Sequence, residues 1–213
     1  MSVETDLSNK DLGKLAEVSG DSPGRRIDHA IEIAREILGM DFGYVSEFVG
    51  GEQILRATSG DGESFEMTEG DGYPLDGTYC QRMVTGQIPK LIPDTSENDK
   101  VRELALTRLS AIGSYVGVPI YLSEGRLFGT FCTISHNPAH QLGERHLRVM
   151  EVLSHIVATG IEQQRLEKEV ERLRAQITNM TTELDDAEGD RRLSRIMMSG
   201  EFQAIPRGAL PPE

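Results

Sequence analysis

The stretch GSYVGVPIYLSEGRLFGTFCTIS, residues 113–135, decides the fold of this chain. Two runs in which a set of mainly apolar side chains recurs at every second position lie on either side of a short polar connection, residues 123–126. The connection holds a glycine, as hairpin turns do. We expect Val116, Val118, Ile120, Leu122, Phe128, Thr130, Cys132 and Ile134 to share one face, with Tyr115, Tyr121, Leu127 and Phe131 on the other. Because both faces are largely apolar, the pattern predicts two strands in the middle of a covered sheet. Pro119 cannot donate to a ladder, so we interpret it as a bulge or an unpaired position.

The rest of the chain predicts helices and strands that can flank this pair. The expected elements are a helix over residues 23–38, strands over 42–49 and 53–58, a short helix over 79–84 capped by Thr78, a strand over 90–92, a helix over 97–106 and a long helix from residue 142. We therefore predict an α/β (α+β) fold, with a central antiparallel sheet flanked by helices.

Composition limits the classes of partner. The chain has 213 residues and a formal net charge of −13, which argues against binding to nucleic acid or to an anionic membrane surface. Two cysteines do not make a secreted disulfide framework, and no apolar run has the length of a signal peptide or membrane span. We expect a cytoplasmic protein.

The last part of the long helix has a heptad pattern. Apolar residues recur at alternating spacings of four and three, at Leu166, Val170, Leu173, Ile177, Met180 and Leu184. β-Branched residues at two of the three a positions favour a parallel two-stranded coiled coil, and hence a homodimer. We divide the chain into a polar N-terminal segment (1–21), a globular domain (22–163), a coiled coil (164–189) and a flexible tail (190–213) that begins after Gly189.

The central stretch also carries a family resemblance. The run YVGVPIYLSEGRLFGTFCTIS, with IPKLIPDT before it and a long helix after it, resembles a GAF domain, and it is similar to the GAF modules often joined to cyclic-di-GMP signalling domains. The resemblance covers about residues 22–163 and implies a sensor fold with a small-molecule pocket beside the segment 59–78. Some GAF relatives attach a bilin through a cysteine before the VPI strand, but residues 99–113 hold none. The two cysteines also cannot supply the set that free methionine sulfoxide reductases of this family need.

The segment 59–78 has no convincing period and holds six carboxylates, five glycines and no lysine or arginine. A loop of this length inside a domain is functional or mobile. The carboxylates lack the spacing of an EF-hand, so we expect no metal site. For the walls of a ligand pocket we select Phe65, Met67, Tyr73, Tyr79, Cys80, Met83, Asp94 and Tyr115. The sequence does not identify a cofactor.

Cys80 is the candidate for redox chemistry. It follows the cap residue Thr78 by two positions, where backbone N–H groups and the helix dipole lower the pKa of a thiol. The alternative is a small apolar filler under the loop, and Cys132, in the middle of a strand, is expected in the core.

Three functions remain open from the sequence. The first is a non-enzymatic regulatory protein, a small-molecule or redox sensor that dimerises and acts on a separate output partner through its C-terminal helix. The second is a ligand-free dimerisation module with a docking tail. The third is a thiol-based redox enzyme that uses Cys80.

Overall fold

A computed structural model of the chain describes residue 13, residues 22–123 and residues 125–198. It forms two units, one that ends at Arg165 and one that begins at Leu166. Most of the expected N-terminal segment 1–21, and the part of the expected tail beyond Met198, lie outside the described residues.

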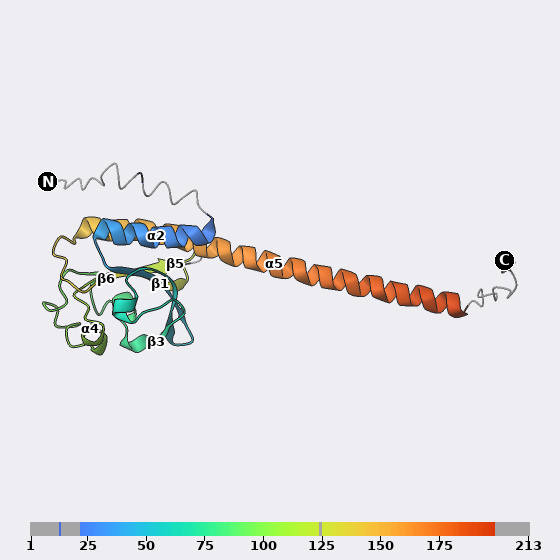
Figure 1. Cartoon of the computed structure of the whole chain (residues 1–213), viewed down its shortest axis with the longest axis horizontal. Coiled ribbons are helices and arrows are strands. Elements are labelled where there is room, and N and C mark those ends of the chain that lie inside the picture. Colours follow the sequence, from blue (N-terminus) through green and yellow to red (C-terminus); the bar gives the residue numbers. More distant parts are fainter. Residues whose placement is uncertain (1–12, 14–21, 124, 199–213) are drawn as a thin grey trace, which may run out of the picture. The chain divides into compact units, whose positions relative to one another are not determined.

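The first unit is built on a six-stranded antiparallel sheet with the strand order β3-β2-β1-β6-β5-β4 (Figure 1). The strands are β1 (Phe42–Val49), β2 (Glu52–Gly60), β3 (Gly72–Pro74), β4 (Leu91–Ile92), β5 (Ser114–Tyr121) and β6 (Leu127–Ser135). The helices are α2 (Pro23–Leu38), α3 (Tyr79–Val84), α4 (Ala105–Leu109) and α5 (Glu144–Met198), with 3-10 turns η1 (Glu63–Phe65) and η2 (Leu75–Gly77). The predicted α+β fold and the central position of residues 114–135 are confirmed.

The register of β5 against β6 corrects the expected faces. Val118 pairs with Phe131 and Gly117 pairs with Cys132, so a paired residue on one strand has the opposite parity to its partner on the other. The even-numbered residues of β5 therefore lie on the face opposite to Thr130, Cys132 and Ile134 of β6, whereas Phe128, beyond the irregularity, lies with Val118 as expected. The irregularity between Ile120 and Tyr121, next to the turn, sets this register.

Pro119 is paired in register with Thr130 and lies just before the irregularity. On the other side of β5, the Gly117 amide donates to the carbonyl of Lys90, 2.8 Å away, at the edge of β4. Pro119 directs its backbone nitrogen to the same side two residues later, where the two-residue strand β4 offers no acceptor. Pro119 therefore needs no donor there, but it lies in the ladder opposite Thr130 and not at the expected bulge or unpaired position.

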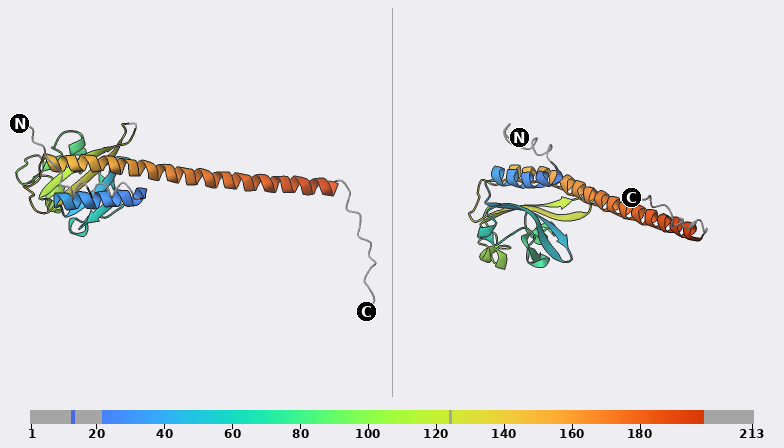
Figure 2. Two further views of the ribbon diagram at one scale, coloured as in Figure 1. Left: turned by 90° about the horizontal axis from the view of Figure 1, so that it is seen from above. Right: turned by 45° about the vertical axis from the view of Figure 1, so that its right-hand side comes forward.

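Each face of the sheet has its own apolar layer. Helix α2 and the first part of α5 lie side by side over one face, as Figure 2 shows from above, and bury residues such as Ile31, Val118, Phe131 and Leu153. The opposite face is covered by α3, α4, η1 and their connections. The second layer holds most of the residues that the sequence marked as a pocket.

Two segments differ from their sequence-based expectations. The stretch 59–78 contains β3, which pairs with β2, and two 3-10 turns. The expected helix over 97–106 is absent, and only Ala105–Leu109 is helical. Short polar side chains explain this: the Asp94 carboxylate accepts from the Ser96 amide and the Asn98 side chain from the Lys100 amide, which favours turns over a helix.

Helix α5 does not stop at Gly189 but continues without a break to Met198, so the first part of the segment 190–213, for which we expect a short helix and a flexible tail, belongs to α5. One glycine in a helix costs about 1 kcal/mol, which is too little to end a long helix. Among the described residues, no helix combines the length and the apolar character that a membrane crossing requires.

Candidate functional site

The candidate site is the apolar layer between the sheet and α3, which we call the α3 layer. Its buried members are Phe42, Tyr44, Leu55, Phe65, Met67, Tyr79, Cys80, Met83, Ile88, Ile92, Val101, Ile112, Tyr115, Cys132 and Ile134. Strands β1, β2, β5 and β6 supply the floor, and α3 with η1 supplies the cover. The layer is unusual because thiols and tyrosine hydroxyls meet at its centre.

Helix α3 begins where the sequence predicts. The side chain of Thr78 accepts a hydrogen bond from the Gln81 amide at 3.2 Å and donates to the Leu75 carbonyl at 2.9 Å. This cap fixes the first turn. It turns Tyr79, Cys80 and Met83 toward the sheet, where all three are buried.

The two cysteines lie against each other. The Sγ atoms of Cys80 and Cys132 are 3.4 Å apart, both thiols are free, and the residues are 1% and 0% exposed. The hydroxyl of Tyr44 lies 3.5 Å from the Cys80 sulfur, and the hydroxyl of Tyr115 lies 3.5 Å from the Cys132 sulfur. The α3 layer therefore contains a dithiol with one phenol beside each sulfur.

The two thiols differ in acidity. Burial raises the pKa of Cys80, but hydrogen bonds from Cys132, Thr130, Tyr44 and Gln53 outweigh it and lower the pKa to about 7. Burial and the neighbouring Cys80 raise the pKa of Cys132 well above its ordinary value. Cys80 is therefore the more acidic thiol of the pair and the one better suited to act as the nucleophile.

More polar groups lie beside the dithiol. The hydroxyls of Ser46 and Thr130 are 2.9 Å apart, and both residues are buried. Gln53 of β2 is 3% exposed, and within the described residues its Oε1 atom has no hydrogen-bond partner. A buried amide oxygen without a hydrogen bond costs free energy of folding. The Oε1 atom of Gln53 can therefore accept a hydrogen bond from a donor group of a bound molecule.

The predicted pocket residues fall into two groups. Phe65, Met67, Tyr79, Cys80, Met83 and Tyr115 all belong to the α3 layer, and Tyr73 packs against it. Their side chains pack on one another, as the ring centroids of Tyr79 and Tyr115, 5.0 Å apart, illustrate. Asp94 is outside the layer and is engaged with Ser96, whose hydrogen bonds lower the pKa of the carboxyl.

Cys132, Tyr44, Gln53 and His136 complete the site, and none of them was selected from the sequence. The alternation of β6 contained the signal for Cys132, but only the register shows which face it occupies. The His136 ring stacks on Phe65 with centroids 3.9 Å apart, and its Nδ1–H donates to the Ala111 carbonyl at 3.0 Å. Its Nε2 lies 2.9 Å from the Ser64 hydroxyl, so His136 holds η1 over the layer.

Side chains at the end of the first unit attach α5 to the sheet. Arg165 of α5 lies 2.8 Å from the Glu47 carboxylate of β1 and 5.0 Å from the ring centre of Phe128. The Glu162 carboxylate accepts a hydrogen bond from the Ser123 amide at the β5–β6 turn. These contacts connect α5 with the strands that carry Tyr44 and Cys132.

The second unit exposes its apolar heptad positions. Leu166, Val170, Leu173, Ile177 and Met180 are 44% to 65% exposed, and the side chain of Leu184 lies outside the described residues. Glu169 forms an ion pair with Arg172 on the same helix. A regular row of exposed apolar side chains on a helix is a face that another helix can cover.

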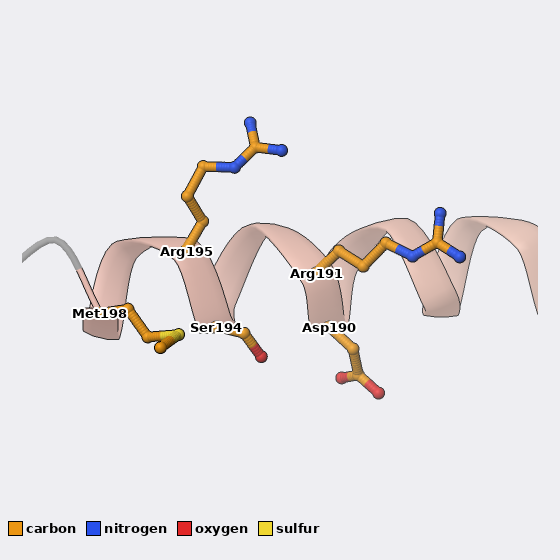
Figure 3. A pocket seen from close by; sticks show the side chains of 5 residues that line it. All are labelled: Asp190, Arg191, Ser194, Arg195 and Met198. Carbon is orange, nitrogen blue, oxygen red and sulfur yellow. The ribbon is translucent and has the colours of Figure 1, made fainter.

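A hollow on the last turns of α5 is lined by Asp190, Arg191, Ser194, Arg195 and Met198 (Figure 3). In Figure 3 Asp190 and Ser194 point to one side of the helix and Arg195 to the other. Because these side chains do not converge, the hollow is not a candidate site. Among the described residues, no three histidine, cysteine or carboxylate side chains gather as metal ligands.

Comparison with known proteins gives one family. The sequence pattern of the GAF domain family matches residues 22–162. A phycocyanobilin-bound GAF domain from a cyanobacterial phytochrome has a TM-score of 0.61 at 18% identity, over 76% of this chain and 98% of that one. The GAF domain of an Acinetobacter phosphoenolpyruvate-protein phosphotransferase has a TM-score of 0.58 at 14% identity, over 75% and 97%.

A free methionine-R-sulfoxide reductase from Neisseria meningitidis, in complex with its substrate, has a TM-score of 0.56 at 15% identity, over 78% of this chain and 98% of that one. No curated protein matches the chain. At these identities the structural likeness establishes the fold and leaves the ligand open.

Proposed function

This chain belongs to the GAF domain family, and from that premise we propose that it is a non-enzymatic, cytoplasmic regulatory protein. Its GAF domain senses a small molecule or a redox change in the α3 layer. Two copies of the chain dimerise through the heptad face of α5, and the same helix carries the signal to a separate output partner.

One observation carries this proposal, namely that α5 has two different halves. Val149, Leu153 and Val157 are fully buried in the domain core, whereas Leu173 and Ile177 further along are exposed. A helix that is buried at one end and leaves an apolar face uncovered at the other is suited to link a sensor to an assembly.

A second copy of the chain is the occupant that the heptad face fits best. The alternating spacings of four and three, with Val170 and Ile177 at a positions, are those of a parallel two-stranded coiled coil. In that arrangement Glu169 at a g position can reach Arg174 at the partner's e position. Regulation then requires two arrangements of the helices with different affinity for the signal.

The polar centre of the α3 layer supports a sensing role. Gln53 and the Cys80–Cys132 dithiol are buried polar groups, whereas a layer that served only for packing would need apolar side chains alone. The attachment of α5 through Arg165 to Glu47 gives a change in β1 a route to the helix. The burial of Cys80 also speaks against a thiol enzyme that acts on a large substrate, because such a substrate cannot reach a sulfur that is 1% exposed.

A ligand-free assembly module is the second candidate, and the exposed heptad face favours it equally. Native mass spectrometry of the full chain purified from its own host separates the two candidates. A sensor of small molecules retains a non-covalent mass on the dimer. A clean dimer that no ligand or oxidant alters supports the assembly module.

The dimer itself is tested with a matched pair of variants. Ile177→Glu places a charge at an a position, and Ala175→Glu places the same charge two residues away at an outward f position. We expect Ile177→Glu to be monomeric, and Ala175→Glu to be dimeric, in sedimentation at micromolar concentration. If Ile177→Glu stays as dimeric as the parent chain, the heptad face is not the interface.

A further inference from the structure

We propose that Cys80 and Cys132 form a reversible disulfide within the GAF domain when the protein meets a peroxide. The sulfurs are 3.4 Å apart in the reduced protein, and a disulfide has an S–S length of about 2.05 Å. Bond formation therefore needs an approach of about 1.4 Å, within the reach of small side-chain rotations. The proposal rests on the proposed function only in taking the α3 layer as the place where the signal acts.

The two sulfurs come from elements of different rigidity. Cys132 lies in β6, which pairs with β1 on one side and β5 on the other, so its backbone is held on both sides. Cys80 lies in the six-residue helix α3, at the end of the segment 59–78. Movement of α3 can thus bring the Cys80 sulfur to a fixed partner.

The surroundings assign a role to each sulfur. Cys80 has the Tyr44 hydroxyl beside it and is the more acidic thiol, so it is the attacking group. Cys132 keeps its proton and is the resolving thiol. Hydrogen peroxide is the oxidant class that suits a closed layer, because it is uncharged and little larger than water.

The reaction balances in two steps. The Cys80 thiolate attacks one peroxide oxygen, an S–O bond forms, the O–O bond breaks, and the hydroxide that leaves combines with the proton that Cys80 released on ionising, which gives the first water. The Cys132 sulfur then attacks the sulfenic sulfur of Cys80, so that an S–S bond forms, the S–O bond breaks, and the Cys132 proton leaves with the hydroxyl as water. Both sulfurs are oxidised, one peroxide is reduced to two waters, and a dithiol reductant reverses the change by exchange.

The bond would alter the α3 layer itself. It ties α3 to the middle of the sheet and removes the free Cys80 thiol that lies 3.5 Å from the Tyr44 hydroxyl. Tyr44 is on β1, which also carries Glu47, the partner of Arg165 on α5. Cys132 is the direct cross-strand partner of Tyr44, and Glu47 lies three residues further along the same strand.

Mass spectrometry of the full chain tests the proposal. The reduced native protein is treated with hydrogen peroxide, quenched, denatured and alkylated with N-ethylmaleimide. We expect the intact mass to fall by two hydrogens, alkylation to be lost at both cysteines, and digestion to release one peptide pair that joins Cys80 to Cys132 within a single chain. Dithiothreitol should restore both alkylations.

Single variants check each sulfur separately. Cys132→Ser removes the resolving thiol, so Cys80 should stop at the sulfenic acid, which dimedone traps. Cys80→Ser leaves only the less acidic thiol, which should react far more slowly. The proposal is wrong if both thiols of the parent chain remain alkylatable after peroxide, whether or not Cys132→Ser yields a sulfenic acid. It is also wrong if the peptides are joined only between chains. The dimer test with Ile177→Glu does not depend on these masses, so the two proposals can fail separately.

Discussion

At the scale of single residues, Tyr44 and Tyr115 form a natural pair of probes, because each places one hydroxyl 3.5 Å from one of the two sulfurs. The hydrogen bond from Tyr44 is one of those that lower the pKa of Cys80 to about 7, against the effect of burial. The groups that face Cys80 are Tyr44, Cys132 and Tyr115, and all three have raised pKa values and are neutral at pH 7.

We therefore expect Tyr44→Phe to raise the pKa of Cys80, so that the rate of thiol alkylation reaches its half-maximum at a higher pH than in the parent chain. Tyr115→Phe deletes the same oxygen beside Cys132 and should leave that midpoint nearly unchanged. The measurement is the alkylation rate of Cys80 as a function of pH. Equal midpoints in the two variants would contradict the assignment of Tyr44 as a donor to Cys80.

The Tyr115 hydroxyl occupies the space in which a side chain on residue 117 would lie. A Cβ atom on residue 117 would lie 2.0 Å from that hydroxyl oxygen and 2.9 Å from the Cys132 sulfur. We expect Gly117→Ala to reduce the free energy of unfolding by about 1–3 kcal/mol, as overpacked cores do, measured by urea denaturation. Gly77→Ala is the control, because none of the described atoms lies within 4 Å of its Cβ; a loss as large there would refute the steric reason.

At the scale of elements, the sequence predicted α2, β1 and α3 because each has a local signal, such as the Thr78 cap of α3. It did not predict the face of Cys132, because the register of β5 against β6 depends on an irregularity beside the turn. The contact between Cys80 and Cys132 joins residues far apart in the chain, and no local pattern reports such a contact. The strand β3 was also missed, because three residues are too few to show a period.

The α3 layer should make the domain sensitive to alkali. Burial raises the pKa of Tyr79 to about 12, and the pKa values of Tyr44 and Tyr115 rise well above the ordinary 10.0 for the same reason. In the unfolded chain these phenols ionise near pH 10, so stability is complete below that pH and falls as pH rises through the folded pKa values. For Tyr79 the loss is about 2 kcal/mol by pH 12.

Urea denaturation across this pH range measures the effect. Tyr79→Phe should flatten the fall of stability with pH, whereas Tyr121→Phe, at a tyrosine that is 53% exposed, should not. A fall that is equally steep in the parent chain and in Tyr79→Phe would show that other groups are responsible.

At the scale of the whole molecule, oxidation should stabilise the domain. A bond between Cys80 and Cys132 closes a loop of about 50 residues, for which chain entropy gives about 4 kcal/mol, and native strain reduces this value. We expect the melting temperature of the peroxide-treated chain to exceed that of the reduced chain by several degrees. Cys132→Ser given the same treatment should show no increase, and an increase in that variant would assign the effect to other oxidised residues.

The burial of the two sulfurs has a consequence for timing. A reductant that removes an exposed disulfide does so at a rate set by its own concentration, whereas one that must reach Cys80 and Cys132 waits for the layer to open. The lifetime of the oxidised protein is then a property of its folding dynamics. After a short exposure to peroxide, the protein would stay oxidised when the peroxide is gone. The stability of the α3 layer would then set how long the disulfide persists.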